Sequence, residues 1–424
     1  MKRRVVITGI GPYINAGKGK DILWDTVINT KNKAQHIPEK FENNYSFKSK
    51  YYIPFPKIEY NETGLHKKFE KIIDDTGKIA IICAKTALED SGYEFYENGD
   101  IPFYNKDLNE ASIIIGIGIP NTFTAYEAFA AHCLGHNENL LNEMGLHSYY
   151  NRMLVPMIMP NSVSGWLSIL FGMHGSNYTI NTACSSGNYA IGEAYRKIKD
   201  NYSDIIIAGG VENYKDNTGT LMRGFDILGT LTKAKDGIPM PFSKQRNGFL
   251  FSEGAACVLI LEEYNRAMKR NAPIYAEIIG YEANSDATNI VLMDEKGLNI
   301  SKIFQKFASS NSIDYINTHG TGTMLNDEVE SKVIKSIFGN KNQQPLINST
   351  KGILGHNIGA SAALEAAVTA LSIQNNMVHP NLSVDNIDNL NVAEGIIQKQ
   401  INTAISTSYG FGGHNSGLLL KKCN

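Results

Sequence analysis

Basic residues are not in excess in this sequence of 424 residues. Lysine and arginine together number 40, against 42 aspartate and glutamate residues, which gives a formal net charge of −2. Nucleic-acid binders normally carry a strong basic excess, so these counts argue against that class of protein. A local basic patch for an acidic partner is still compatible with them, because net charge averages over the whole surface.

Long apolar runs are missing as well. No stretch approaches the roughly 20 apolar residues that a membrane-spanning helix needs. The chain begins with a methionine and three basic residues, as a signal peptide can, but the apolar run that follows is short and meets Gly9, Gly11 and Pro12. We therefore predict a first β-strand here and not a targeting segment.

Cysteines are few, and their number and spacing argue against a disulfide-linked protein and against a metal-binding one. Five is an odd number in a long chain, and no pair has the spacing of metal ligands. We therefore predict free thiols in a reducing compartment, the cytoplasm by default, and no metal site. The five are Cys83, Cys133, Cys184, Cys257 and Cys423.

Short apolar runs alternate with helical patterns, which predicts an α/β fold with buried strands. Strands are expected at 5–8, 112–115, 178–181, 205–208, 257–261, 275–279, 313–317, 346–349, 404–407 and 417–420. Helices are expected at 77–91, 187–199, 326–338 and 359–374. Residues 29–63 and 121–159 have little periodicity and are predicted as excursions from the core, the second of them capping a pocket or a subunit interface.

The most informative cysteine is Cys184, which follows an expected strand. The turn Ser185-Ser186-Gly187 and a helix come next, so the thiol would lie at a helix N-terminus. Exposed N–H groups and the helix dipole there favour a thiolate, which is the nucleophilic form. A buried structural cysteine is the alternative, and it is the interpretation we keep for Cys83 and Cys257.

Three further glycine-rich turns carry the groups that could assist such a nucleophile. His319 ends a strand and is followed by Gly-Thr-Gly-Thr, and Lys351 and His356 flank a Gly-interrupted loop before an alanine-rich helix. The third turn is Gly410-Phe-Gly-Gly413, a candidate mobile loop with one large apolar side chain. Each pattern alone also fits a structural role, but their combination points to catalysis.

With these motifs the sequence resembles the elongating β-ketoacyl-acyl-carrier-protein synthases, which include polyketide ketosynthases. The resemblance extends from Val5 to Leu420. It implies a thiolase fold, in which two similar halves (1–262 and 263–424) stack as α-β-α-β-α layers. It also implies decarboxylative condensation of an acyl thioester with malonyl-acyl carrier protein. The matching blocks are Thr182-Ala-Cys184-Ser-Ser, His319-Gly-Thr-Gly-Thr323, Ser349-Thr-Lys351, Gly355-His356 and Gly410-Phe-Gly-Gly413.

The resemblance also implies catalytic roles. Cys184 would carry the acyl group, with its own backbone N–H and that of Phe411 as the oxyanion hole. Neutral His319 and His356 would hold the enolate oxygen that decarboxylation produces. Lys351 would support the two histidines, with the carboxylate of Glu330 as its partner.

Further positions would bind the substrate. Thr321 and Thr323 would hold the phosphopantetheine arm, and Phe411 would gate the acyl pocket. Ile119 and Gly412 match substrate-binding positions, Ile119 in the acyl tunnel. No cofactor of the enzyme's own is implied, because phosphopantetheine belongs to the carrier protein.

Some positions depart from the family pattern without removing a catalytic group. Pro120 replaces a usual glycine, and His414 replaces a usual threonine in the gate loop. Both positions lie near the inferred pocket and gate, so the departures bear on acyl specificity. We therefore favour a specialised polyketide or polyene pathway, with housekeeping fatty-acid elongation as the alternative.

Related classes fit the sequence less well. A biosynthetic thiolase would use a second cysteine near the C-terminus as a base, whereas Cys423 lies in a polar tail. An initiating synthase would show Cys-His-Asn, and a chain-length factor would lack the cysteine. The chain is still compatible with the active half of a heterodimer with such a factor, as well as with a homodimer.

Acyl carrier protein is the expected partner. Because that protein is acidic, a basic patch is expected near the entrance of the site. The candidates for this patch are Lys67, Lys68, Lys71 and Arg223, each of which could equally be an ordinary solvated charge.

Overall fold

The computed structural model describes residues 3–135, 137–146 and 150–423. Its centre is an 11-stranded mixed sheet, in the order β13-β12-β16-β17-β11-β1-β10-β9-β7-β8, with β2 (Gly17–Lys18) attached to β1. The ten strands of this order are β1 (Val5–Ile14), β7 (Ser112–Gly116), β8 (Asn177–Ile180), β9 (Ile205–Asn213), β10 (Gly254–Glu263), β11 (Ala276–Ser285), β12 (Tyr315–Asn317), β13 (Leu346–Asn348), β16 (Thr403–Gly410) and β17 (His414–Lys421). Each predicted strand overlaps one of them.

The two halves of the sheet repeat one topology. The orders β1-β10-β9-β7-β8 and β11-β17-β16-β12-β13 both have two antiparallel pairings followed by two parallel ones. The halves join where β1 pairs with β11 over three residues, Val5 to Ile7. This repeat is the internal similarity expected of a thiolase fold.

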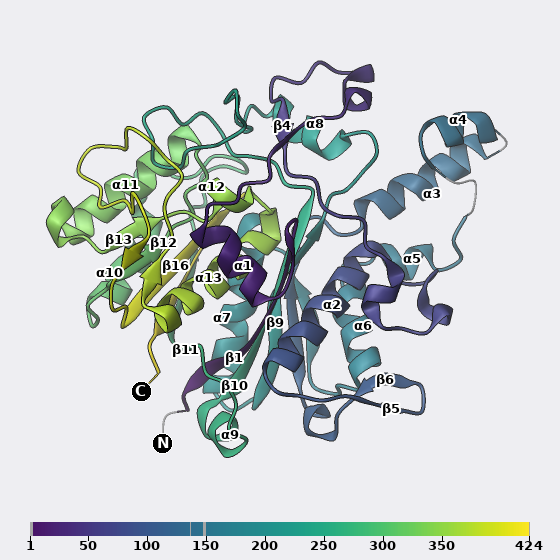
Figure 1. The fold of residues 1–424 in the computed structure, drawn as a ribbon, viewed down its shortest axis with the longest axis horizontal. Helices are drawn as coiled ribbons and strands as arrows, with labels where there is room; N and C mark the ends of the chain where they lie inside the picture. The colour runs from purple at the N-terminus through teal and green to yellow at the C-terminus, as the bar shows by residue number, and fades with distance from the viewer. Residues whose placement is uncertain (1–2, 136, 147–149, 424) are drawn as a thin grey trace.

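Helices divide the fold into layers (Figure 1). α7 (Ser186–Lys199) and α13 (Ser361–Asn375) lie in the middle and contact strands of both halves. α2 (Asp75–Asp90) and α6 (Ser162–Phe171) contact strands of the first half, whereas α10 (Leu298–Ala308) contacts strands of the second and packs on α11 (Met324–Phe338). The arrangement is therefore α-β-α-β-α.

The alanine-rich sequence of α13 explains how the central layer packs. Residues 361–373 are all buried, with small side chains at 362, 363, 366, 367 and 370. A Cβ added at Gly187 of α7 would lie only 2.8 Å from the backbone nitrogen of Ala363. The two helices thus approach closely enough to bring the turns before them together.

The two predicted excursions are mostly irregular or peripheral. Residues 29–63 contain only one-turn helices and two-residue strands. Within 121–159, of which 136 and 147–149 lie outside the described residues, α3 (Thr122–Leu134) and α4 (Glu138–Glu143) project from the body in Figure 1. α3 exposes Phe129 and α5 (Leu154–Ile158) exposes Val155. Within the described ranges, no helix combines the length and apolar character needed to cross a membrane.

Candidate active site

Cys184 lies in a tight turn between β8 and α7. The turn is a short 3-10 helix, Ala183–Ser185, and Ala183 has a φ of 50°, a conformation that costs free energy for a residue with a side chain. Hydroxyl groups tie the turn together, since Ser185 Oγ donates to Thr182 O (2.7 Å) and Ser186 Oγ donates to Ala183 O (2.6 Å). The sequence prediction of a strand, a sharp turn and a helix is confirmed.

The thiol itself differs from the prediction of a thiolate. Cys184 is only 5% exposed, and this burial raises the pKa of its thiol to about 12. The charge of Lys351 and the backbone N–H groups of Phe411 and Cys184 lower the pKa, but by less than burial raises it. The resting group is therefore a neutral thiol, and the expectation based on the helix N-terminus alone was wrong.

This raised pKa predicts how Cys184 reacts with iodoacetamide. Because only the thiolate is alkylated, the rate at Cys184 should rise about tenfold per pH unit between pH 7 and pH 10. Peptide mapping after timed alkylation separates Cys184 from the exposed Cys133. A rate that levels off near neutral pH would contradict the neutral resting thiol.

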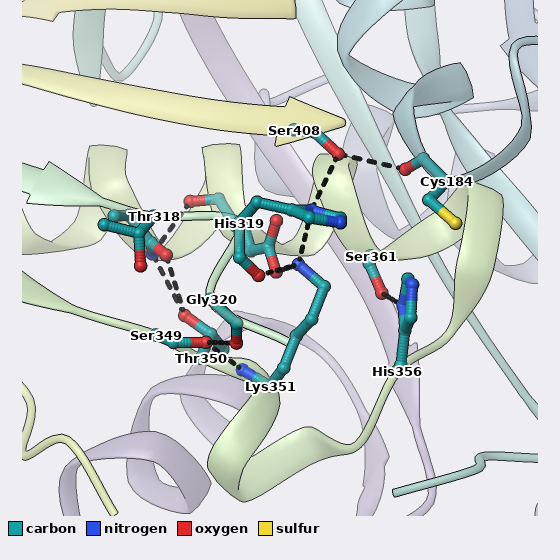
Figure 2. A network of polar contacts seen from close by, with 12 residues as sticks. Cys184, Thr318, His319, Gly320, Ser349, Thr350, Lys351, His356, Ser361 and Ser408 are labelled. Carbon is teal, nitrogen blue, oxygen red and sulfur yellow. Dashed lines mark hydrogen bonds and ion pairs between the residues drawn. The ribbon is translucent and has the colours of Figure 1, made fainter. Parts of the chain in front are cut away.

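His319, at the end of β12, faces the cysteine turn with Lys351 beside it (Figure 2). The Lys351 ammonium donates to the backbone oxygen of His319 (2.7 Å) and lies 3.2 Å from His319 Nδ1. Because an ammonium group can only donate, Nδ1 is the acceptor and the imidazole proton lies on Nε2. Burial, followed by the Lys351 charge, holds the pKa of His319 well below its usual range, so the ring is neutral.

His356 has the same tautomer for a different reason. Its Nδ1 accepts the backbone N–H of Ile358 (3.2 Å) and contacts Ser361 Oγ (3.0 Å), which leaves the proton on Nε2. Burial lowers the pKa of His356 well below its usual range. The two imidazole rings are 5.6 Å apart between centroids and nearly perpendicular. The site thus contains two neutral N–H donors beside one thiol.

The carboxylate that pairs with Lys351 is not the predicted one. Glu365 of α13 accepts from Lys351 Nζ at 2.5 Å, and both side chains are buried. Glu330 instead accepts the backbone N–H groups of His319 (3.0 Å) and Gly320 (2.9 Å). The prediction that Glu330 is the partner of Lys351 is therefore corrected: Glu330 shapes the His319 turn, and Glu365 neutralises the lysine.

Removing Glu365 should destabilise the protein strongly. Glu365→Leu leaves the Lys351 ammonium buried without a counter-charge, and we expect a loss of about 3–5 kcal/mol in the free energy of unfolding, measured in urea. The double variant Lys351→Met/Glu365→Leu should recover most of that loss. A single variant that loses less than about 1 kcal/mol would contradict the pairing.

A cavity of about 270 Å³ opens onto these groups, and we call it the entrance cavity. Thr321 and Thr323 lie on its wall with their hydroxyl oxygens 2.8 Å apart. Such a pair can hydrogen-bond a polar linker. Its lining also includes Cys184, Phe225, Phe249, His319, His356, Tyr409 and Phe411.

Two predicted substrate-binding residues lie outside this lining. Ile119 packs against an apolar cluster that includes Cys184, Tyr214 and Phe251, and we call it the aromatic cluster. Gly412 has a φ of 86° and donates its N–H to Ile290 O (2.7 Å). The gate loop therefore has a glycine in the left-handed region, and a hydrogen bond joins it to a neighbouring loop.

Comparisons with known proteins agree on one family. Residues 2–266 match the Beta-ketoacyl synthase, N-terminal domain, and residues 275–385 match the Beta-ketoacyl synthase, C-terminal domain. The chain belongs to the β-ketoacyl synthase family. This condensing-enzyme family is the one that the motifs indicated.

Relatives of this β-ketoacyl synthase match over their full length. The 3-oxoacyl-[acyl-carrier-protein] synthase 1 of Buchnera aphidicola subsp. Acyrthosiphon pisum is 30% identical in an alignment 429 positions long, which covers 99% of this chain and 100% of the relative. Among solved structures, the ishigamide ketosynthase/chain length factor superposes with a TM-score of 0.84 at 25% identity, with 100% of both chains covered. The type II PKS complex AntDE:AntF, an acyl-carrier protein with its ketosynthase, gives a TM-score of 0.80 at 26% identity and the same coverage.

Sequence reasoning missed one contact of this synthase that links its two halves. Ser408 Oγ donates to Cys184 O (3.0 Å) and lies 3.4 Å from His319 Nδ1 (Figure 2). Ser408 lies in β16, between the predicted strand 404–407 and the Gly410-Phe-Gly-Gly413 turn, and a serine in a strand gives no indication of such a role. Glu365 was missed for a similar reason, since it looks like any residue of an alanine-rich helix.

The basic candidates do not form one group. Lys67, Lys68 and Lys71 line a surface hollow together with Arg152. Arg223 lies on α8 (Thr220–Ile227), with its guanidinium 4.7 Å from the centre of the Tyr45 ring. The described residues contain no group of three or more histidine, cysteine or acidic side chains placed to hold a metal ion.

Proposed function

We propose that this synthase condenses an acyl thioester with malonyl-acyl carrier protein, with loss of CO2, to give a β-ketoacyl-carrier protein. One observation carries the proposal: a buried thiol, two backbone N–H groups beside it and two neutral imidazole donors share one cavity. Acyl transfer needs the first two, and decarboxylation needs the third.

In the first stage Cys184 Sγ bonds to the acyl carbon of the incoming thioester. The bond from that carbon to the phosphopantetheine sulfur breaks, and the proton of Cys184 ends on the released thiol. The carbonyl oxygen becomes an oxyanion, which the N–H groups of Cys184 and Phe411 stabilise. Because burial disfavours a free thiolate, transfer occurs when the substrate fills the site and excludes water.

In the second stage the malonyl carboxylate leaves as CO2, and its bonding electrons form an enolate. The Nε2–H groups of His319 and His356 donate to the enolate oxygen. The enolate carbon then attacks the acyl carbonyl on Cys184, and the carbon–sulfur bond breaks. The thiolate takes a proton from solvent, as its raised pKa requires.

Lys351 keeps the two histidines in their working form. Its ammonium fixes the His319 tautomer through Nδ1, and its charge adds to the larger effect of burial in lowering the pKa of both imidazoles. Neutral histidines can donate to an enolate without giving up a proton to it. Thr321 and Thr323 hold the phosphopantetheine arm along the cavity wall, and Phe411 gates the space at Cys184.

Partners and pathway belong to the same proposal. The chain works with acyl carrier protein in the cytoplasm, where its five free cysteines stay reduced. It pairs with a second copy or with a related chain-length subunit. The likeness to the ishigamide ketosynthase/chain length factor favours a specialised pathway, whereas the likeness to 3-oxoacyl synthases supports fatty-acid elongation as a second candidate.

The experiment uses the full chain, a panel of acyl-carrier proteins and malonyl-carrier protein. We expect one CO2 released for each β-ketoacyl-carrier protein formed, measured by gas analysis and by mass spectrometry of the carrier protein. A panel on which neither product appears would overturn the proposed reaction.

A further inference from the structure

A wall of aromatic side chains packs in the same apolar cluster as Cys184. Tyr214 follows β9, is 2% exposed, and belongs to the aromatic cluster with Cys184, Ile119 and Phe411. Its ring stacks on Phe251, with centroids 6.2 Å apart and an interplanar angle of 29°. Phe225 packs on the same ring of Phe251 at 5.9 Å, which makes the wall continuous.

The entrance cavity stops at this wall. Its lining runs from Thr323 and Met293 to Cys184 and Phe411, and it includes none of Ile119, Tyr214 and Phe251. The entrance cavity therefore has room for the phosphopantetheine arm. Ile119, which the family resemblance places in the acyl tunnel, packs instead against the aromatic cluster that contains Cys184 and Tyr214.

Backbone contacts hold Tyr214 in place. Its own N–H donates to Glu253 O (2.5 Å), and the neighbouring Glu212 carboxylate accepts the N–H groups of Ile119 (3.4 Å) and Gly359 (3.2 Å). The phenol oxygen of Tyr214 lies 3.3 Å from the point that a Cβ on Gly118 would occupy. Tyr214 is thus fixed between β9 and the Gly118–Ile119 turn.

Phe411, unlike Tyr214, is followed by two glycines. Both have a positive φ, Gly412 of 86° and Gly413 of 78°, and their backbone can adopt other conformations. A swing of this loop has to break the hydrogen bond from the Gly412 N–H to Ile290 O. Moving Phe411 aside frees the volume of one side chain next to Cys184. Tyr214 and Phe251, which belong to the same cluster as Cys184 and Phe411, keep their positions when Phe411 moves.

We infer that Tyr214 restricts the acyl group on Cys184 to short chains, of the acetyl to butyryl class. The inference rests on the proposed function, since it concerns the acyl group that Cys184 carries. An acyl chain of octanoyl length would have to displace a packed aromatic ring. Apolar pockets discriminate by about 10- to 200-fold for each methylene that does not fit.

The test compares rates of Cys184 acylation by acetyl-, butyryl-, octanoyl- and dodecanoyl-carrier protein, followed by intact-protein mass spectrometry. The wild-type chain should prefer butyryl over octanoyl by at least about 10-fold. Tyr214→Ala should reduce that preference to about 3-fold or less, or reverse it. Tyr214→Phe is the matched control, because it keeps the ring and should keep the preference.

The ratio of rates protects the test from a general loss of folded protein, because such a loss lowers all four rates together. Tyr214→Leu, a smaller change in volume, should shift the ratio in the same direction as Tyr214→Ala. A wild-type chain that takes octanoyl as fast as butyryl would overturn the inference, as would an unchanged ratio in both the alanine and leucine variants. Acylation by none of the four would overturn the proposed function instead.

Discussion

Cys184→Ala is expected to abolish acylation and condensation, by about 10⁴-fold or more, while malonyl decarboxylation continues. The substitution removes the only group in the entrance cavity that forms a covalent bond to the acyl carbon. It leaves His319 and His356 with their Nε2–H donors, so the enolate oxygen is still stabilised. Intact-protein mass spectrometry measures the adduct, and CO2 release is measured separately.

A matched control is available in the exposed Cys133, on α3. Cys133→Ala should acylate and condense at the wild-type rate. An acyl adduct that persists on Cys184→Ala would show that another residue carries the acyl group. A loss of CO2 release in the same variant would contradict the separation of the two stages.

His319→Ala should have the opposite effect on the two stages. Losing one hydrogen-bond donor to a developing oxyanion costs about 10²–10³ in rate, so CO2 release and condensation should fall by that factor. Acylation of Cys184 should stay within a few-fold of wild type, because the N–H groups that serve that stage belong to Cys184 and Phe411. Rapid acylation with slow CO2 release is the expected pattern.

The control for His319 is His174, an exposed histidine that is not part of the entrance-cavity lining. His174→Ala should leave both rates unchanged. Undiminished CO2 release in His319→Ala would refute its role in decarboxylation. Slow acylation in that variant would indicate instead that the histidine acts on the thiol.

The sequence predicted the fold and most of the site because both depend on local patterns. Buried strands appear in the sequence as short apolar runs. Cys184, His319 and Phe411 each lie in a turn that follows a strand or joins two strands. The carboxyl ends of neighbouring parallel strands lie at one edge of a sheet, so motifs far apart in sequence meet there. A short spacing pattern is enough to find such residues.

The predictions that were wrong concern groups whose surroundings come from segments far apart in the sequence. The helix N-terminus suggested a thiolate at Cys184, but burial by residues such as Phe225, Phe249 and Ile358 determines its pKa. The partner of Lys351 depends on where α13 lies, and no local pattern distinguishes Glu365 from Glu330. The short acyl pocket that we infer likewise rests on Tyr214 and Ile119 packing in one cluster, which no local pattern reveals.

The most direct test of this account locates the acyl group on the wild-type chain. The protein is incubated with butyryl-carrier protein, digested, and its cysteine peptides are analysed by tandem mass spectrometry. We predict one butyryl group per chain on the peptide with Cys184, discharged when malonyl-carrier protein is added. A butyryl group on Cys133 or Cys423, or one on Cys184 that malonyl-carrier protein does not remove, would contradict the central claim.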